Sequence, residues 1–120
     1  MGGVDHNALA NELLDGIEDV SALLKALANE KRVAILRHLL QGEKSVGEMG
    51  QLLDLSQSAL SQHLARLRGA LIVKTRRVAQ TIYYSLDGGR AKIVLRALHE
   101  ASIEKPRQPD EITPRQSPAA

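Results

Sequence analysis

The chain of 120 residues has a net charge of +2 and contains no Cys, Phe or Trp. The missing cysteines exclude disulfides, thiolate metal sites and thiol redox switches. No apolar run reaches the roughly 18 residues of a membrane span, and the N-terminus lacks a basic start followed by an apolar stretch, so we expect a cytoplasmic protein with no membrane partner. A core of Leu, Ile, Val and Ala favours helices, and so short a chain gains from a partner subunit.

Apolar periodicity predicts two helices in the first part of the chain. Large aliphatic residues recur at helical spacing over residues 9–27, with Gly16 as the place for a bend. The stretch "NEKRVAILRHLLQG" predicts a second helix, which Asn29 caps and Gly42 ends. Its inward-facing side chains are expected to be Val33, Leu36, Leu39 and Leu40.

Two further helices are predicted next, separated by a tight connection. Ser45 and Glu48 have the spacing of a capping box, which predicts a short third helix. Residues 54–56 form the connection, and Ser56 is the expected cap of the fourth helix. At about 100° per residue, one side of this fourth helix gathers leucines. They are Leu60, Leu64, Leu67 and Leu71.

The remaining ordered part is predicted to be a hairpin and one helix. The segment "IVKTRRVAQTIYYSL" alternates and is rich in β-branched and aromatic residues, which predicts two strands that turn near Ala79-Gln80. A final helix is predicted over residues 89–103. Residues 104–120 hold all four prolines, so we expect a disordered tail after a domain of residues 1–103. The fold class is therefore mainly α with a small β-hairpin, in the order α-α-α-α-β-β-α.

Two short helices joined by a tight turn and followed by a hairpin predict a winged helix-turn-helix. Opposite its leucines, the fourth helix carries short uncharged side chains, namely Ser58, Gln62 and Ala65, flanked by Gln57 and Ser61. A Gln amide can donate to and accept from an adenine edge at once, and Ser can bond to bases or phosphate. The alternative is that these residues only solubilise an exposed helix, but serines cost helix stability without structural return. We therefore expect this face to read double-stranded DNA.

The distribution of charge supports this interpretation. Residues 1–55 carry five basic and nine acidic side chains, whereas residues 56–86 carry five basic side chains and no Asp or Glu. A solvated basic face is the ordinary explanation of such a run, but a merely soluble surface normally mixes both signs. The missing acids indicate a segment that attracts a polyanion.

Residues 23–86 resemble the ArsR/SmtB family of dimeric winged-helix repressors. The matching motifs are "LANEKRVAIL", the "S-x-S-x-L-S-Q-H-L" recognition helix, the "V-x-x-R-R" entry to the wing and the "YYSL" exit. Within the family, "LSQSALSQHL" and "TRRVAQTIYYS" are most similar to members without a metal site, such as the nodulation-gene repressor branch. The resemblance implies a homodimeric repressor on an imperfect palindromic operator, with no cofactor.

Two sets of site residues follow from these patterns. The expected DNA contacts are Ser56, Gln57, Ser58, Ser61, Gln62, His63, Arg66, Arg68, Lys74, Arg76, Arg77, Gln80 and Tyr83. The first and last helices are apolar on more than one side, which predicts that they pack against both the core and a second subunit. The expected dimer contacts are Leu13, Ile17, Val20, Leu24, Val94, Leu98 and Ala101.

Other function classes fit this sequence less well. Metal-sensing relatives use thiols in the third helix, which this chain lacks, or Asp and His on the last helix, where Asp87, His99 and Glu100 are an incomplete match. No metal is therefore expected, although a metal- or small-ligand-responsive regulator stays the alternative, and the inducer is unknown. The chain has no phosphate loop, nucleophile elbow or clustered acid pair, so an enzyme is not expected. A helical protein-interaction adaptor would not need the basic hairpin.

Overall fold

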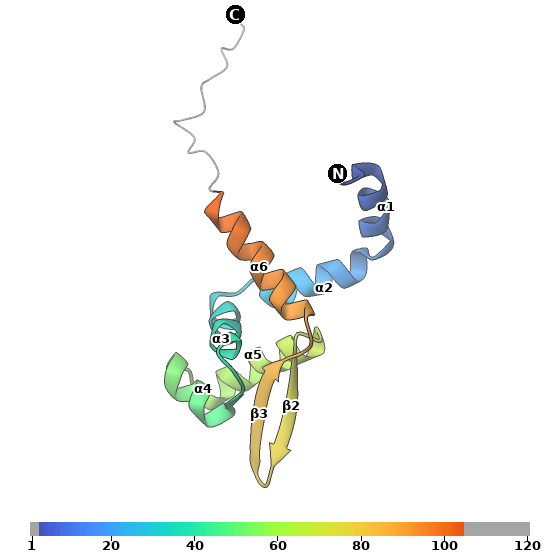
Figure 1. Ribbon diagram of the computed structural model, residues 1–120. Helices are drawn as coiled ribbons and strands as arrows, with labels where there is room; N and C mark the ends of the chain where they lie inside the picture. The colour runs from blue at the N-terminus through green and yellow to red at the C-terminus, as the bar shows by residue number, and fades with distance from the viewer. Residues whose placement is uncertain (1–2, 105–120) are drawn as a thin grey trace, which may run out of the picture.

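The computed structural model describes residues 3–104 (Figure 1). Its elements are, in chain order, α1 (His6–Asp15), α2 (Ile17–Leu27), α3 (Glu30–Leu40), β1 (Lys44–Ser45), α4 (Val46–Leu53), α5 (Gln57–Gly69), β2 (Val73–Val78), β3 (Thr81–Leu86) and α6 (Arg90–Ile103). The predicted mainly helical fold with a hairpin is confirmed, with two changes. The first predicted helix is divided into α1 and α2, and strand β1 precedes α4. Of the predicted tail, all but Glu104 lies outside the described residues.

The first helix divides at Gly16, where the sequence suggested a bend. Gly16 ends α1 and begins α2, with a φ of −103° that leaves the helical range. Glycine has the weakest helix propensity after proline, so a break here costs less than at any neighbouring residue. As a result α1 projects away from the body of the molecule and contains no buried residue (Figure 1).

The core surrounds α3, and its inward face differs from the predicted one. Ile35 and Leu36 are fully buried, whereas Val33 and Leu40 are exposed, so the prediction that the latter two face inward was wrong. Helical geometry explains the difference, because Ile35, Leu36 and Leu39 form one stripe that Arg32 continues, and the two exposed residues lie beside it. The other fully buried side chains are Met49, Leu60, Leu64, Leu67, Ile72 and Val73.

The two helices of the helix-turn-helix begin and end as their caps predict. The Ser45 hydroxyl accepts from the Glu48 N–H at 3.1 Å and the Glu48 carboxylate accepts from the Ser45 N–H at 2.8 Å, which completes the predicted capping box of α4. Asp54 ends α4 in the left-handed conformation, with a φ of 53°. The Ser56 hydroxyl then caps α5 by accepting from the Ala59 N–H.

The leucine stripe of α5 is shorter than predicted. Leu60, Leu64 and Leu67 are buried, but Leu71 lies beyond the end of the helix with a φ of 60° and is 62% exposed. Helix α5 ends at Gly69, so Leu71 no longer follows the helical spacing. The next buried side chain is Ile72.

The hairpin is the expected wing, and β1 extends it to a three-stranded antiparallel sheet. The strand order is β1-β3-β2, with Ser45 opposite Tyr83 and the hairpin turn at Ala79 and Gln80. Two-residue strands leave no alternation to recognise, which is why β1 was not predicted. Within residues 3–104, no helix is both long and apolar enough to cross a membrane.

Candidate nucleic-acid interface

Helix α5 turns one side to the core and another to solvent. Its three buried leucines belong to the core, while Ser58 and Gln62 are exposed on the opposite side, as the periodicity predicted. A third row, one residue on each successive turn, consists of exposed residues that face the hairpin. These residues are Gln57, Ser61, Ala65 and Arg68.

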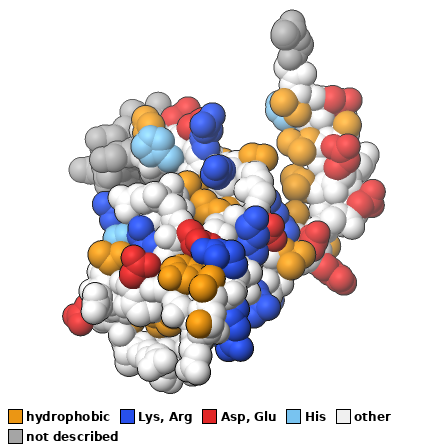
Figure 2. Space-filling view, turned by 60° about the horizontal axis from the view of Figure 1, so that its bottom comes forward, with side chains coloured by type: hydrophobic (Ala, Val, Ile, Leu, Met, Phe, Trp, Pro, Cys, Tyr) orange, Lys and Arg blue, Asp and Glu red, His pale blue; other side chains and the backbone are white. Residues whose placement is uncertain are grey.

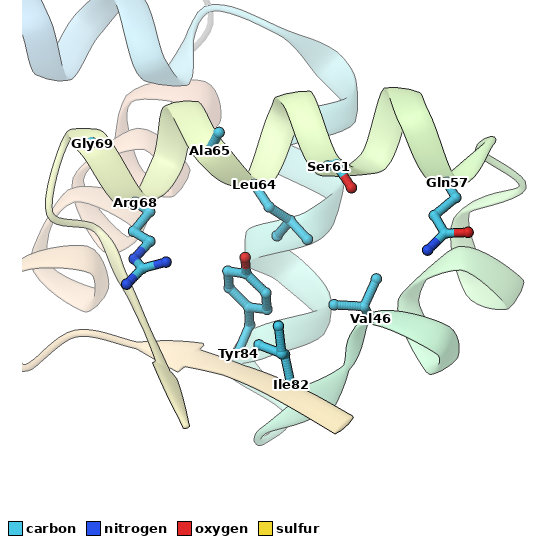
Figure 3. A pocket seen from close by; sticks show the side chains of 9 residues that line it. All are labelled: Val46, Gln57, Ser61, Leu64, Ala65, Arg68, Gly69, Ile82 and Tyr84. Atoms are coloured by element: carbon cyan, nitrogen blue, oxygen red, sulfur yellow. The ribbon is translucent and has the colours of Figure 1, made fainter. Parts of the chain in front are cut away.

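An open groove of about 500 Å³ lies between this third row and the hairpin (Figure 3). Gln57, Ser61 and Arg68 form one wall, and Ile82 and Tyr84 form the other, over an apolar floor. Tyr84 was not among the expected site residues, although alternation in β3 places it on the same side as Ile82. The groove therefore has cationic and amide groups on its helix side and a phenol on its strand side.

The basic residues of the hairpin divide between its two faces. Residues directly opposite in antiparallel strands share a face, so Arg77, opposite Ile82, lies on the groove side. Arg76 is opposite Tyr83 and therefore lies on the other side, as does Lys74. All three basic side chains are exposed, and Gln80 is exposed at the turn.

Arg76 is paired with an acid from outside the acid-free segment. Its Nη2 and Nε donate to the two carboxylate oxygens of Glu43 at 2.7 and 3.0 Å, and its guanidinium lies 5.0 Å from the centre of the Tyr83 ring. The hydrogen bond from Arg76, with the positive charge of Arg76 and Lys74, holds the pKa of Glu43 below its usual value. The charge count along the sequence therefore overstates the free positive charge of the hairpin.

His63 faces the protein rather than the outer side of α5. Its Nδ1 lies 3.3 Å from Nη1 of Arg32, the one buried charged residue among residues 3–104. Because a guanidinium can only donate, Nδ1 must accept the hydrogen bond. This nitrogen therefore carries no proton, and the imidazole is neutral. Burial, followed by the charges of Arg32, Arg66 and Lys31, lowers the pKa of His63.

Within residues 3–104 Arg32 has no acidic partner, and carbonyl groups accept its hydrogen bonds. Its Nε donates to the Ala26 carbonyl and its Nη2 to the Lys25 carbonyl at 3.1 Å, both in the last turn of α2. The C-terminal end of a helix carries partial negative charge, which compensates the guanidinium. Arg32 thus joins α2 and α3 to the recognition helix through His63.

Two further residues expected to contact DNA, Arg66 and Ser56, do not lie in the α5 groove. Arg66 borders a hollow beside α2 rather than the α5 groove, together with Ala22, Lys25 and Ala26. Ser56 uses its hydroxyl to cap α5, so its side chain already has a partner.

The expected dimer residues leave large apolar side chains at the surface of the single chain. Leu13, Ile17 and Leu24 are 47–60% exposed, Leu98 and Ala101 are exposed on α6, and Val20 and Val94 are partly buried. In Figure 2, α1 projects at the right with a row of hydrophobic side chains on one side and acidic side chains on the other. Such a face is unusual for a lone chain.

The incomplete metal-site match does not become a cluster in this chain. Asp87 precedes α6, whereas His99 and Glu100 lie near its other end. Among the described residues, no three His, Asp or Glu side chains come together as metal ligands would.

The architecture of these elements is shared with known regulators. Residues 29–75 match the family described as "Bacterial regulatory protein, arsR family". The transcriptional activator HlyU of Vibrio cholerae is 54% identical over 77 residues, which are 64% of this chain and 71% of that protein. The chain belongs to the ArsR family. It is thus a winged-helix transcriptional regulator and not an enzyme.

Other relatives support the predicted branch of the family. The nodulation protein NolR of Rhizobium meliloti is 45% identical over 92 residues, or 77% of this chain and 75% of NolR. The biofilm growth-associated repressor of Agrobacterium fabrum is 46% identical over 81 residues, or 68% of this chain and 69% of the repressor. The solution structure of the homodimeric winged helix-turn-helix domain of Mb0332 from Mycobacterium bovis has a TM-score of 0.69 at 26% identity, over 86% of this chain and 90% of that one.

Proposed function

We propose that the protein is a homodimeric repressor that binds an imperfect palindromic operator in double-stranded DNA. The observation that carries the proposal is the outer side of α5, where Ser58 and Gln62 are exposed beside the groove that Arg68 lines, with Arg77 on the same face of the hairpin as Ile82 of the groove wall. Amides and hydroxyls on a helix match the donor and acceptor pattern of the major groove, and guanidinium groups match phosphate.

The start of α5 enters the major groove in this proposal, so that Gln57 and Gln62 meet base edges. One DNA strand then passes along the groove between α5 and the hairpin. There Arg68 and Arg77 contact phosphate groups, and the hydroxyls of Ser61 and Tyr84 add hydrogen bonds. The hairpin turn reaches the backbone or the minor groove beyond. The remaining proposed contacts with DNA are Ser56, Ser58, Arg66, Lys74 and Gln80.

The dimer is supported by the exposed apolar side chains of α1, α2 and α6. These helices lie on the far side of the body from the hairpin turn (Figure 1), so a second copy packed there leaves both recognition helices free. The homodimeric state of the Mb0332 domain is consistent with this arrangement. A two-fold dimer places its recognition helices in successive major grooves, roughly 34–36 Å apart, which is why the operator is expected to be palindromic.

Repression is favoured as the outcome of binding because a dimer on its operator physically excludes other proteins from the promoter. Several relatives of this chain are named repressors. Activation is the second candidate, since HlyU is named an activator. The position of the operator relative to the promoter decides between the two.

The proposal is tested by capturing genomic fragments with the purified full chain and titrating the recovered operator and a random duplex at several salt concentrations. We expect the operator to bind at least about a thousandfold more tightly than random duplex, with both affinities falling steeply as salt rises. A protein-interaction adaptor would show no salt-dependent affinity for either duplex, and that result would overturn the proposal.

A further inference from the structure

The ion pair between Arg76 and Glu43 crosses the sheet. Arg76 belongs to β2 at one edge, whereas Glu43 immediately precedes β1 at the other edge, and β3 lies between them. The guanidinium lies over the ring of Tyr83, the residue of β3 that faces Arg76 across the ladder and also pairs with Ser45 of β1. The three side chains therefore connect all three strands on one face.

We propose that Arg76 is a positioning residue of the wing and not a contact with DNA. Together, Glu43, Arg76 and Tyr83 form a sheet strap that holds the hairpin at a fixed angle to the helix-turn-helix. This inference rests on the proposed function, because the hairpin angle matters only where the wing and α5 must meet one DNA molecule.

The strap adds to the few pairings that join the hairpin to β1. A two-stranded hairpin is only marginally stable by itself, and β1 adds two residue pairs to it, Lys44 with Tyr84 and Ser45 with Tyr83. The strap ends at Glu43, two residues before the Ser45 that caps α4. The strap thus connects the hairpin to the start of the first helix of the helix-turn-helix.

The geometry leaves Arg76 poorly suited to hold phosphate. Two of its three guanidinium nitrogens already donate to one carboxylate, and the ladder turns its side chain away from the α5 groove. Arg77 lies on the groove side. To bind Arg76, a phosphate would have to displace the Glu43 carboxylate, which is held by two hydrogen bonds. Arg77 is exposed, so a phosphate can bind it without displacing that carboxylate.

A pair of neutral variants separates the two roles. If Arg76 positions the wing, Glu43→Gln and Arg76→Gln each weaken operator binding about threefold, and the double variant is no weaker than either, because all three lose the same contact. The dependence of log affinity on log salt stays at the wild-type slope in Arg76→Gln. Glu100→Gln, an exposed carboxylate of α6, controls for the loss of one acid.

A direct contact between Arg76 and DNA predicts different results for both variants. In that case Glu43→Gln frees Arg76 and strengthens binding, and Arg76→Gln lowers the salt slope by about one per subunit. Either result would overturn the inference.

A measurement without DNA distinguishes failure of the strap from failure of the proposed function. Amide hydrogen exchange in β2 and β3 of the free protein should be about threefold faster in Glu43→Gln and in Arg76→Gln, and unchanged in Arg77→Gln. Faster exchange in a protein that binds no duplex would keep the strap and reject the DNA proposal. Unchanged exchange in both strap variants would reject the strap whatever the DNA affinity.

Discussion

Gln62 lies on the side of α5 away from the buried leucines, where its amide is free to meet a base edge. We expect Gln62→Ala to weaken operator binding by about 1–3 kcal/mol and to leave random-duplex affinity almost unchanged. Fluorescence anisotropy titrations on the two duplexes measure this difference. Gln41→Ala, which removes an exposed amide at the end of α3, should change neither affinity. An equal loss on both duplexes would mean that Gln62 holds the backbone and reads no base.

The contact between His63 and Arg32 makes stability depend on pH. Because the pKa of His63 is lower in the folded protein than its usual value of 6.5, the unfolded chain takes up the proton first as pH falls. The contribution of His63 is therefore fully present above about pH 6.5 and is lost as pH falls towards the lower pKa of the folded state. Urea unfolding at about pH 7.5 and 5.5 should show a smaller decrease in free energy of unfolding for His63→Gln than for wild type.

The exposed histidine of α6 provides the control for this pH effect. His99→Gln should keep the wild-type decrease between the two pH values, since His99 lies far along the chain from Arg32 and is exposed. If His63→Gln also keeps the full decrease, the imidazole is not the group that couples stability to pH.

The exposed side of α5 could be predicted, but the partners that its residues and those of the hairpin find in other elements could not. The exposed side of α5 follows from the 3.6-residue period, so Ser58 and Gln62 lie where expected. Glu43 is 33 residues from Arg76 and His63 is 31 from Arg32, and no local pattern joins residues so far apart. For this reason the sequence could not distinguish the five cations of residues 56–86, whereas the structure pairs one of them with Glu43 and separates the others onto different faces.

At the scale of single elements, the capping box of α4 is both predicted and observed. Ser45→Ala removes one of its two hydrogen bonds and should lower the free energy of unfolding by about 1 kcal/mol, measured by urea denaturation. Ser58→Ala is the matched control, because this serine is exposed within α5 and should leave stability within about 0.5 kcal/mol of wild type. Equal effects of the two substitutions would show that the cap contributes nothing beyond helix propensity.

Element boundaries were predictable where caps and breakers are local. Asn29 caps α3 by accepting from the Lys31 and Arg32 N–H groups, and the hairpin turns at Ala79 and Gln80, as expected. The inward face of α3 could not be predicted, because the burial of Arg32 on that face depends on carbonyl groups at the end of α2. The sequence does not indicate that the carbonyl groups of a neighbouring helix accept the hydrogen bonds of this arginine.

At the scale of the whole molecule, assembly is expected to depend on the apolar face of α1, α2 and α6. We predict a dimer at micromolar concentration in sedimentation equilibrium, converted to monomer by Leu24→Lys. Leu24 is 60% exposed in the single chain, and Leu52 of α4, which is 52% exposed, provides the control. Leu52→Lys should stay dimeric. A wild-type monomer at this concentration would contradict the prediction.

In the proposed function, α5 and the groove side of the wing form the DNA surface. The most direct test is the salt dependence of DNA binding by Arg77→Ala. The exposed Arg77 shares a face with Ile82 of the groove wall, so its expected partner is phosphate. In titrations of operator and random duplex at several salt concentrations, Arg77→Ala should weaken both similarly and reduce the slope of log affinity against log salt by about one unit per subunit. Lys92→Ala, an exposed lysine of α6, should leave the slope unchanged. An unchanged slope in Arg77→Ala, or the same reduction in Lys92→Ala, would contradict the assignment of this surface.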